Sequence, residues 1–327
     1  MIRSIVKWPG GKGRVIPDLL PHLPKADCLI DPFVGGASVF LNTDYRRYVL
    51  ADINPDLINL YREVTRHPEL VIHSARYLFE NFNSPDGYAE IRRAFNIKGF
   101  YCHSPFGMSG LLAMSAKITR AAQFLYLNRH GYNGVVRYNQ SGGYNVPFGN
   151  HKSAPYLPEA EIRLFAEKAK DTTAIFMCCP FEVTIQATAN KDAVLYCDPP
   201  YLPVSETANF TQYHSTPFGA PQHRELVAAL LAANIKHGIP VVLSNSDTAA
   251  TRDIYKAFNF QEISVNRSVS SKVSTRAAAK EVIGTLKVCA GCGRHGGGRC
   301  PDCGPCCGDA TYREMMATAA AYGVEPF

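Results

Sequence analysis

Short apolar runs recur along the chain and alternate with stretches that carry apolar residues at helical spacing. Such runs, bounded by turn-forming residues, are typical of strands that helices bury on both faces. The expected strands are residues 27–33, 48–53, 174–178, 193–197, 240–243 and 260–265. One expected helix follows the first strand and ends near residue 42. The other expected helices span 55–65 (with Asn54 as N-cap), 68–80, 158–169 and 223–233. This alternation predicts the α/β class, with a doubly wound, Rossmann-like sheet covered by helices on both faces.

The segment 91–150 interrupts this alternation. It is rich in Gly, Asn and Tyr, which predicts small helices and a hairpin in a module inserted into the sheet domain. Residues 91–158 contain no Asp or Glu, but they include Arg92, Arg93, Lys98, Lys117, Arg120, Arg129, Arg137 and Lys152. A second acid-free run, 265–280, is also basic. One charge run is commonly a solvated face, but two in one chain favour a polyanionic partner such as nucleic acid.

Composition places the chain among globular proteins. Its 327 residues are 46% hydrophobic and 19% charged, with a formal net charge of +6, so it can fold around a sizeable core and can bind nucleic acid. It has no apolar run of about 18 residues and no secretory signal in its first residues, so we expect no membrane partner and a cytoplasmic location. Five scattered cysteines fit reduced thiols, whereas the other six lie in the last 39 residues.

A glycine-bearing turn follows the first expected strand, in the order Asp31-Pro32-Phe33-Val34-Gly35-Gly36-Ala37. Glycines let a ligand approach the backbone, and the following helix N-terminus offers unpaired N–H groups. Asp52 ends the next strand, where a carboxylate can accept hydrogen bonds from both ribose hydroxyls of a nucleoside. A plain tight turn and a helix-capping acid are the structural alternatives. Together the two features favour a cofactor of the adenosine type.

The sequence Asp198-Pro199-Pro200-Tyr201 directly follows the expected strand 193–197. Two prolines stiffen the backbone and remove two N–H donors, so the Pro199 carbonyl can be held facing outward. A carboxylate beside a fixed carbonyl makes two acceptors for one exocyclic amino group, and the adjacent tyrosine ring can stack on a planar base. The structural alternative is a stiffened loop with a buried aspartate.

Further motifs accompany this tetrapeptide. They are Lys7-Trp8-Pro9-Gly10-Gly11-Lys12, 128–139 (NRHGYNGVVRYN), 145–149 (NVPFG), 244–248 (SNSDT) and 267–271 (RSVSS). From about residue 3 to 285, the chain resembles the D12 class of Dam-type DNA adenine-N6 methyltransferases. The resemblance implies a methyltransferase sheet, S-adenosylmethionine as cofactor, and double-stranded DNA in which a flipped adenine within GATC is methylated. The alternatives are a methyltransferase of RNA bases or protein amides, or a catalytically inactive DNA-binding scaffold.

The resemblance assigns roles to individual positions. The catalytic residues are Asp198, Pro199, Pro200 and Tyr201. The cofactor-binding residues are Trp8, Lys12, Asp31, Phe33, Gly35, Asp52 and Asp198. The DNA-binding residues are Lys7, Arg129, Tyr132, Asn133, Val135, Arg137, Pro147, Arg267 and Ser268.

Among these, Tyr132 and Asn133 match positions inserted near the target base pair, and Arg137 can read a guanine with two hydrogen bonds. Val135 and His151 stand where close relatives often carry other residues, which leaves a relaxed or shifted recognition sequence open. The 35–37 turn has Gly-Gly-Ala where relatives often have Gly-Ala-Gly, and its small residues should still admit the cofactor.

The last 39 residues have a composition of their own. Two Cys-x-x-Cys pairs, Cys289 with Cys292 and Cys300 with Cys303, flank a Gly-rich loop. Four thiolates at this spacing are typical of a zinc knuckle, and a metal would stabilise a tail with so few apolar residues. A disordered tail or disulfides are the alternatives. The expected organisation, in a monomer or weak dimer, is a cofactor half (1–60), a DNA-recognition module (61–155), a second catalytic half (156–287) and the tail (288–327).

Overall fold

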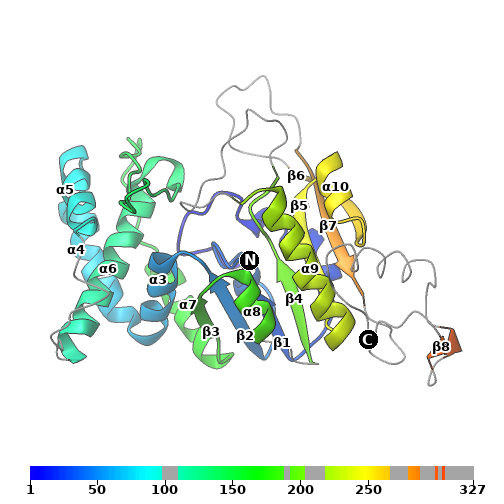
Figure 1. Ribbon diagram of the computed structural model, residues 1–327. Helices are drawn as coiled ribbons and strands as arrows, with labels where there is room; N and C mark the ends of the chain where they lie inside the picture. Colours follow the sequence, from blue (N-terminus) through cyan, green and yellow to red (C-terminus); the bar gives the residue numbers. More distant parts are fainter. Residues whose placement is uncertain are drawn as a thin grey trace.

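The computed structural model describes residues 1–97, 110–187, 192–202, 218–265 and 279–287, together with the short strands β8 (Arg299–Cys300) and β9 (Gly304–Pro305). A seven-stranded sheet runs through it in the order β3-β2-β1-β4-β5-β7-β6 (Figure 1). Its strands are β1 (Cys28–Asp31), β2 (Arg47–Asp52), β3 (Ile175–Cys178), β4 (Ala193–Cys197), β5 (Val241–Ser246), β6 (Asn259–Val265) and β7 (Ala279–Leu286). The predicted α/β class is confirmed.

The order of the sheet reverses between β1 and β4. From β1 the chain runs outward through the parallel strands β2 and β3, and it then returns to place β4 and β5 on the other side of β1. β7 is antiparallel to both of its neighbours, β5 and β6. In open α/β sheets, ligands bind beyond the carboxyl ends of the strands where the order reverses. The topology therefore predicts a ligand site at the carboxyl ends of β1 and β4.

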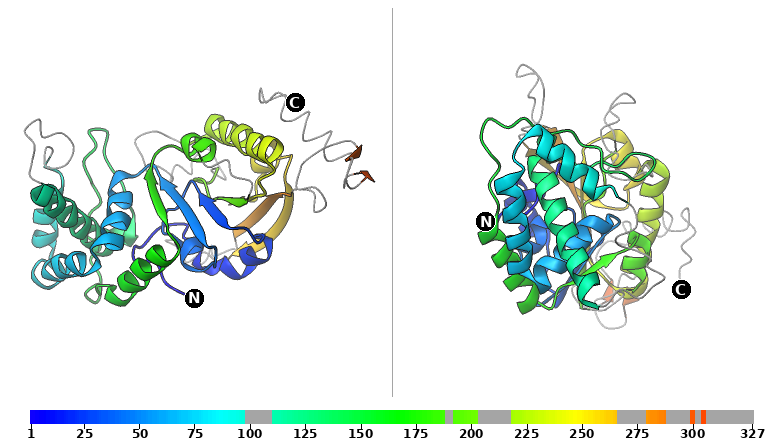
Figure 2. Two further views of the ribbon diagram at one scale, coloured as in Figure 1. Left: turned by 90° about the horizontal axis from the view of Figure 1, so that it is seen from below. Right: turned by 90° about the vertical axis from the view of Figure 1, so that its left-hand side faces the viewer.

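Helices pack on both faces of the sheet (Figure 2). One core includes α1 (Ile16–Leu19), α2 (Ser38–Leu41), α3 (Pro55–Arg66) and α7 (Glu159–Asp171). The other includes α8 (Phe181–Ala187), α9 (Ala220–His237) and α10 (Ala249–Ile254). Successive residues of β4 serve opposite cores, Val194 and Tyr196 the first, Leu195 and Cys197 the second. Burial on both faces explains why this strand is an unbroken apolar run in the sequence.

Helices α4 (Pro68–Asn81), α5 (Pro85–Phe95) and α6 (Gly110–His130) lie beyond α3, to the left of the sheet in Figure 1. The turn η3 (Tyr132–Gly134) follows α6, and isolated antiparallel bridges join Gly131 to Phe148 and Tyr138 to Tyr144. This pairing agrees with the expected hairpin. The expectation of small helices is wrong for α6, a single helix of 21 residues. Its sequence is rich in Ala, Leu and other helix formers, whereas the Gly and Asn residues of the segment are concentrated after residue 130.

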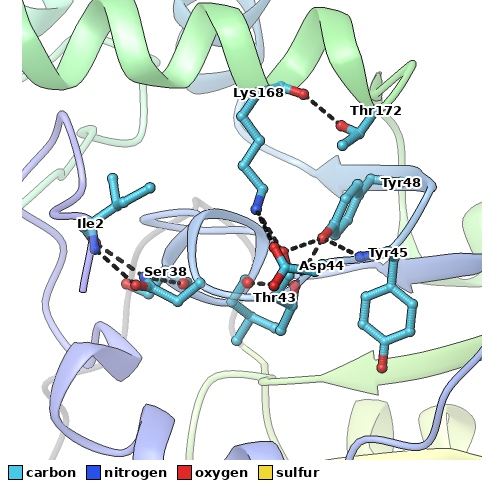
Figure 3. Close-up of polar contacts among 10 residues, drawn as sticks. Ile2, Ser38, Thr43, Asp44, Tyr45, Tyr48, Lys168 and Thr172 are labelled. Carbon is cyan, nitrogen blue, oxygen red and sulfur yellow. Dashed lines mark hydrogen bonds and ion pairs between the residues drawn. The ribbon is translucent and has the colours of Figure 1, made fainter.

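Side-chain hydrogen bonds cap the start of α3 and attach α7 to a neighbouring turn. The Asn54 side chain accepts hydrogen bonds from two backbone N–H groups of the first turn of α3, at 3.0 and 3.2 Å, which confirms the predicted N-cap. On α7, the Lys168 ammonium donates to the Thr43 carbonyl at 2.5 Å and lies 3.8 Å from Asp44 (Figure 3). The Tyr48 hydroxyl donates to the same carbonyl at 2.6 Å. These contacts join α7 to the turn between α2 and β2.

The apolar pattern does not predict every element, and α8, α10 and β7 are among those that it misses. β7 begins at the end of the basic run 265–280, and its second and third residues are charged. Its strand conformation comes from pairing on both sides with β5 and β6. Within the described part of the chain, no helix combines the length and apolar character needed to cross a bilayer. The division into four segments stays a prediction.

Candidate active site

Three carboxylates stand at the carboxyl ends of neighbouring parallel strands. Asp31 ends β1, Asp52 ends β2, and Asp198 directly follows β4. Because β1 lies between β2 and β4, the three residues share one edge of the sheet, at the point where its order reverses. The structure thus brings together three residues that are far apart in the sequence and that the sequence analysis predicts as site residues.

The glycine turn orients Asp52. Its carboxylate accepts hydrogen bonds from the backbone N–H of Gly35 at 3.2 Å and from that of Asn54 at 2.9 Å. Gly35 has a φ of +44°, and a Cβ atom there would lie 2.8 Å from Nε1 of Trp8, so a side chain would be both strained and obstructed. Burial raises the pKa of Asp52 to about 6, against the effect of the backbone donors. The side chain that caps α3 is that of Asn54, so Asp52 is not the helix-capping acid of the structural alternative.

Asp31 is more deeply buried, with 2% of its surface exposed. Its carboxylate accepts a hydrogen bond from the backbone N–H of Phe33 at 3.0 Å. Burial holds the pKa of Asp31 well above its ordinary value, and the neighbouring Asp198 and Asp52 carboxylates add to the rise. The ring of Phe33 stacks on that of Phe181 of α8 at a centroid distance of 5.7 Å. Phe33 therefore has an aromatic neighbour at this edge of the sheet.

Lys12 connects the 198–201 loop to two other elements. Its ammonium, from η1 (Lys12–Arg14), lies 2.9 Å from the Asp198 carboxylate and donates to the Tyr201 hydroxyl at 2.6 Å. Tyr201 in turn donates to the Glu281 carboxylate of β7 at 2.8 Å. The Glu281 carboxylate is also 3.9 Å from the Lys12 nitrogen. The sequence analysis predicts Lys12, Asp198 and Tyr201 but misses Glu281, because the signal for it is an acid inside a strand that the pattern does not predict.

The carboxyl ends of the strands carry an excess of acidic groups. Burial raises the pKa of Asp198 to about 6; the Lys12 ammonium opposes this rise, and the Glu281 carboxylate adds to it. Among the described residues, Lys12 pairs with Asp198 and Glu281, and no ion pair reaches Asp31 or Asp52. Buried carboxylates stabilise a cation that can approach them. The arrangement therefore suits a ligand with positive charge.

Side chains of β4 and β5 form hydrogen bonds at the two ends of the 198–201 loop. The Ser246 hydroxyl donates to the Leu202 carbonyl at 3.2 Å, and the hydroxyls of Tyr196 and Ser244 share a hydrogen bond of 3.1 Å. Both serines belong to the 244–248 motif. Pro199 is buried and Pro200 partly buried in the loop that they support. In the described structure, the 244–248 motif therefore has a role in holding this loop.

The N-terminal motif and the end of α6 meet at a second place. The Lys7 backbone donates to the Asn128 side chain at 2.8 Å, and the Lys7 ammonium donates to the Arg129 carbonyl at 3.2 Å. Gly134 has a φ of +66°, and a Cβ atom there would lie 2.2 Å from Cβ of Lys7. The Arg129 side chain is only 5% exposed, and its guanidinium lies 4.5 Å from the ring centroid of Tyr156. Arg129 thus lies beneath this surface, whereas Lys7 is partly exposed on it.

Several residues predicted to contact DNA gather around η3. Tyr132 is 55% exposed, and its backbone N–H donates to the Pro147 carbonyl at 2.9 Å. Arg137 is exposed and donates to the side chain and carbonyl of Asn145 at 2.8 and 3.1 Å. The exposed or partly exposed members of the predicted set are Lys7, Tyr132, Asn133, Val135, Arg137 and Pro147.

Part of the predicted site lies outside the described residues. Arg267, Ser268, Cys289, Cys292 and Cys303 fall there, and only the backbone of Cys300 is described, in β8. Within the described ranges, no three His, Cys, Asp or Glu side chains are grouped to hold a metal ion. The zinc site in the tail stays a prediction.

The chain is similar to known proteins over most of its length. The sequence pattern of the D12 class N6 adenine-specific DNA methyltransferases matches residues 8–269. A DNA adenine methylase of Salmonella typhi is 45% identical over 283 residues, which cover 86% of this chain and 94% of the relative. The DNA adenine methylase of Escherichia coli K12 is 43% identical over 286 residues (87% and 95%), and that of Vibrio cholerae is 42% identical over 283 (86% and 95%). The chain therefore belongs to the D12 class of N6 adenine-specific DNA methyltransferases.

Proposed function

We propose that the protein transfers a methyl group from S-adenosylmethionine to N6 of an adenine flipped out of duplex DNA, within GATC. The observation that carries the proposal is the position of Asp198, in a proline-stiffened loop at the sheet's reversal point beside Asp31 and Asp52. Family membership supports the adenine N6 target. The donor, the flipped base and the recognition sequence are the further steps proposed.

The residues at the strand ends fit S-adenosylmethionine. This cofactor carries a sulfonium and an ammonium group, and the acidic groups around Asp198 favour positive charge. Asp52, already oriented by two backbone N–H groups, would accept hydrogen bonds from the ribose hydroxyls. Trp8 packs on Gly35, whose backbone N–H donates to Asp52, and the absence of a side chain at Gly35 leaves room for the Trp8 ring. When bound, the cofactor supplies an electrophilic methyl group.

The 198–201 loop would act on the adenine amino group. Its nitrogen is a poor nucleophile, because its lone pair is delocalised into the ring. The Asp198 carboxylate and the Pro199 carbonyl would accept the two amino hydrogens and favour the pyramidal nitrogen that attacks. Tyr201 would stack on the flipped base. The bound donor would supply the methyl group and keep the electrons of the sulfur–methyl bond, and Asp198 would take the proton that the amino nitrogen releases and pass it to solvent. Positioning and electrostatics would supply most of the acceleration.

The surface around η3 would hold the duplex. Tyr132 and Asn133 are exposed beside Lys7, where they can fill the space that a flipped base leaves. Arg137 would release Asn145 to read a guanine, and nearby basic residues would contact phosphates and make binding depend on salt. The GATC target rests on the family resemblance, with Val135 and His151 as departures.

The test is transfer of labelled methyl from S-adenosylmethionine to unmethylated duplexes, with modified positions mapped. We expect methylated adenine in GATC and none in duplexes where that site is changed. Methylated adenine elsewhere would overturn the specificity, and labelling of RNA or protein alone would overturn the substrate. DNA binding without methylation would favour the inactive scaffold.

Asp198→Asn tests the loop, because it keeps the shape of the side chain but removes its charge. We expect loss of methyl transfer with retained DNA binding. Asp253→Asn, an exposed acid on α10, is the matched control and should stay active. Full activity of Asp198→Asn would contradict the assigned chemistry.

A further inference from the structure

Glu281 is a buried acid inside the sheet, opposite the polar end of β5. It lies in β7, in register with Ser246 of β5 and Ile263 of β6, and it is followed by the fully buried Val282 and Ile283. Its side chain is 8% exposed. Burying a carboxylate is costly unless partners compensate for the lost water. The fold does not need an acid here, so its contacts indicate what it does.

Those contacts include Glu281 in a directed chain of hydrogen bonds. The Tyr201 hydroxyl has one proton, and it donates this proton to Glu281 at 2.8 Å. The same oxygen accepts from the Lys12 ammonium at 2.6 Å, and that ammonium lies 2.9 Å from Asp198. Lys12 is also 4.5 Å from the centroid of the Tyr201 ring. The phenol is therefore held at its oxygen by a donor and an acceptor from different elements, which fixes the position of the outer end of the ring.

We propose that Glu281 is a positioning residue for methyl transfer. It fixes the Tyr201 ring, and it provides the Lys12 ammonium with a second carboxylate besides Asp198. The proposal rests on the function proposed above, in which Tyr201 stacks on the target adenine. With Glu281 in place, Tyr201 is oriented before DNA binds. Lys12 then has a second carboxylate besides Asp198, so Asp198 stays available as an acceptor for the amino group.

The charge of Glu281 also acts on Asp198. Among the described residues, the titratable groups around Asp198 are Lys12 of η1, Glu281 of β7, Asp31 of β1, Tyr196 and Cys197 of β4, and Tyr201. Lys12 lowers the pKa of Asp198, whereas Glu281 raises it. Removing the charge at position 281 should therefore move the Asp198 titration to lower pH. A Glu281 carboxylate that is not coupled to Asp198 predicts no such movement.

Two substitutions separate the hydrogen bond from the charge. Glu281→Gln keeps an oxygen that can accept from Tyr201, so we expect the methylation rate constant to fall less than about tenfold and the acid limb of the pH–rate profile to shift to lower pH. Glu281→Ala removes both, and release of the ring should lower the rate constant by about 100-fold, with a smaller change in KM for DNA. The matched control is Glu262→Ala on β6, an exposed acid paired with Arg252.

Fluorescence of 2-aminopurine at the target position reports whether the extruded base is stacked. We expect the signal of the Glu281→Gln complex to match wild type and that of Glu281→Ala to differ. In a Tyr201→Phe background, Glu281→Ala should cost much less, because the hydroxyl that it holds is absent. The proposal would be overturned if Glu281→Ala lowered the rate constant equally in the wild-type and Tyr201→Phe backgrounds. It would also be overturned if Glu281→Gln and Glu281→Ala lowered the rate constant equally and the acid limb of the pH–rate profile did not move.

A measurement without DNA keeps this proposal separate from the proposed function. The carbon-13 signal of the Asp198 carboxyl, assigned with Asp198→Asn, can be titrated in the free protein. We expect Glu281→Gln to lower the midpoint and Glu262→Gln to leave it unchanged. An unmoved midpoint contradicts the coupling even in an active enzyme, whereas a lowered midpoint in a protein that methylates no adenine would refute the function alone.

Discussion

Removal of the Asp56 carboxylate should loosen the contact between the sheet and the helices beside it. Asp56, in the first turn of α3, accepts two hydrogen bonds from Arg120 of α6, at 2.5 and 3.0 Å, and one from the Tyr138 hydroxyl at 2.6 Å. The Asp56 and Arg120 side chains are 7% and 19% exposed. Arg120 also donates to the Phe95 carbonyl at 2.7 Å. One carboxylate thus joins α3, α6 and the 131–150 segment.

The size of the effect follows from what Asp56→Ala leaves behind. Breaking a buried ion pair by removing one partner costs about 3–5 kcal/mol, because the other charge stays buried without its counter-ion. Arg120 is partly exposed and keeps its bond to Phe95, so the lower value applies. We expect the free energy of unfolding to fall by about 3 kcal/mol, which corresponds to roughly 4 °C in Tm for a chain of 327 residues.

Urea unfolding followed by circular dichroism measures this loss. The control is Glu69→Ala, which removes an exposed ion pair with Arg163 and should leave the unfolding midpoint unchanged. The double variant Asp56→Ala/Arg120→Leu should lose less than the sum of the single losses, since neither charge is left alone. Additive losses, or an Asp56→Ala midpoint equal to that of the control, would refute the reasoning.

The same substitution should weaken DNA binding more than cofactor binding. Tyr138 lies within the 131–150 segment that carries Tyr132 and Arg137, and Asp56→Ala removes the acceptor of its hydroxyl. Binding titrations with a duplex and with S-adenosylmethionine separate the two effects. Equal losses for both ligands would show that Asp56 does not act through this segment.

Four further predictions follow from single features of the structure. Since burial raises the pKa of Asp198 to about 6 and its ionised form accepts the amino hydrogens, kcat/KM should fall as pH drops through about 6; a flat profile between pH 7 and 5 would contradict this role. Gly134→Ala should displace Lys7 and reduce DNA affinity in an anisotropy titration, while cofactor affinity is unchanged. Arg137→Ala should reduce discrimination against altered recognition sites by about 1–3 kcal/mol, and unchanged discrimination would remove it from base recognition. The purified chain should contain about one zinc per molecule by metal analysis, and a Cys289→Ser/Cys292→Ser variant should contain none; a metal-free wild type would end the zinc-knuckle hypothesis.

Local sequence determined much of the fold and the centre of the site. The apolar runs that become β1, β4 and β5 are recognisable because both faces of these strands are buried, and shorter apolar runs mark β2, β3 and β6, which are partly exposed. The N-cap Asn54 was predicted from its position before Pro55, since capping involves only adjacent residues. The same local pattern puts Asp52 at the end of one strand and Asp198 directly after another, whereas Asp31 falls inside the expected strand 27–33 and only the structure ends β1 there.

Tertiary structure alone decided the contacts that complete the site. Glu281 has no local signal for a site residue, and only the antiparallel insertion of β7 beside β5 carries it to Tyr201 and Lys12. Asp56 likewise looks like an ordinary acid in the first turn of a helix until α6 and Tyr138 pack against it. Local patterns reflect the backbone and its nearest neighbours. Partners that are 64, 80 or 189 residues away in the chain are brought into contact by the folding of the whole molecule, and these partners decide which charges are paired and which pKa values are shifted.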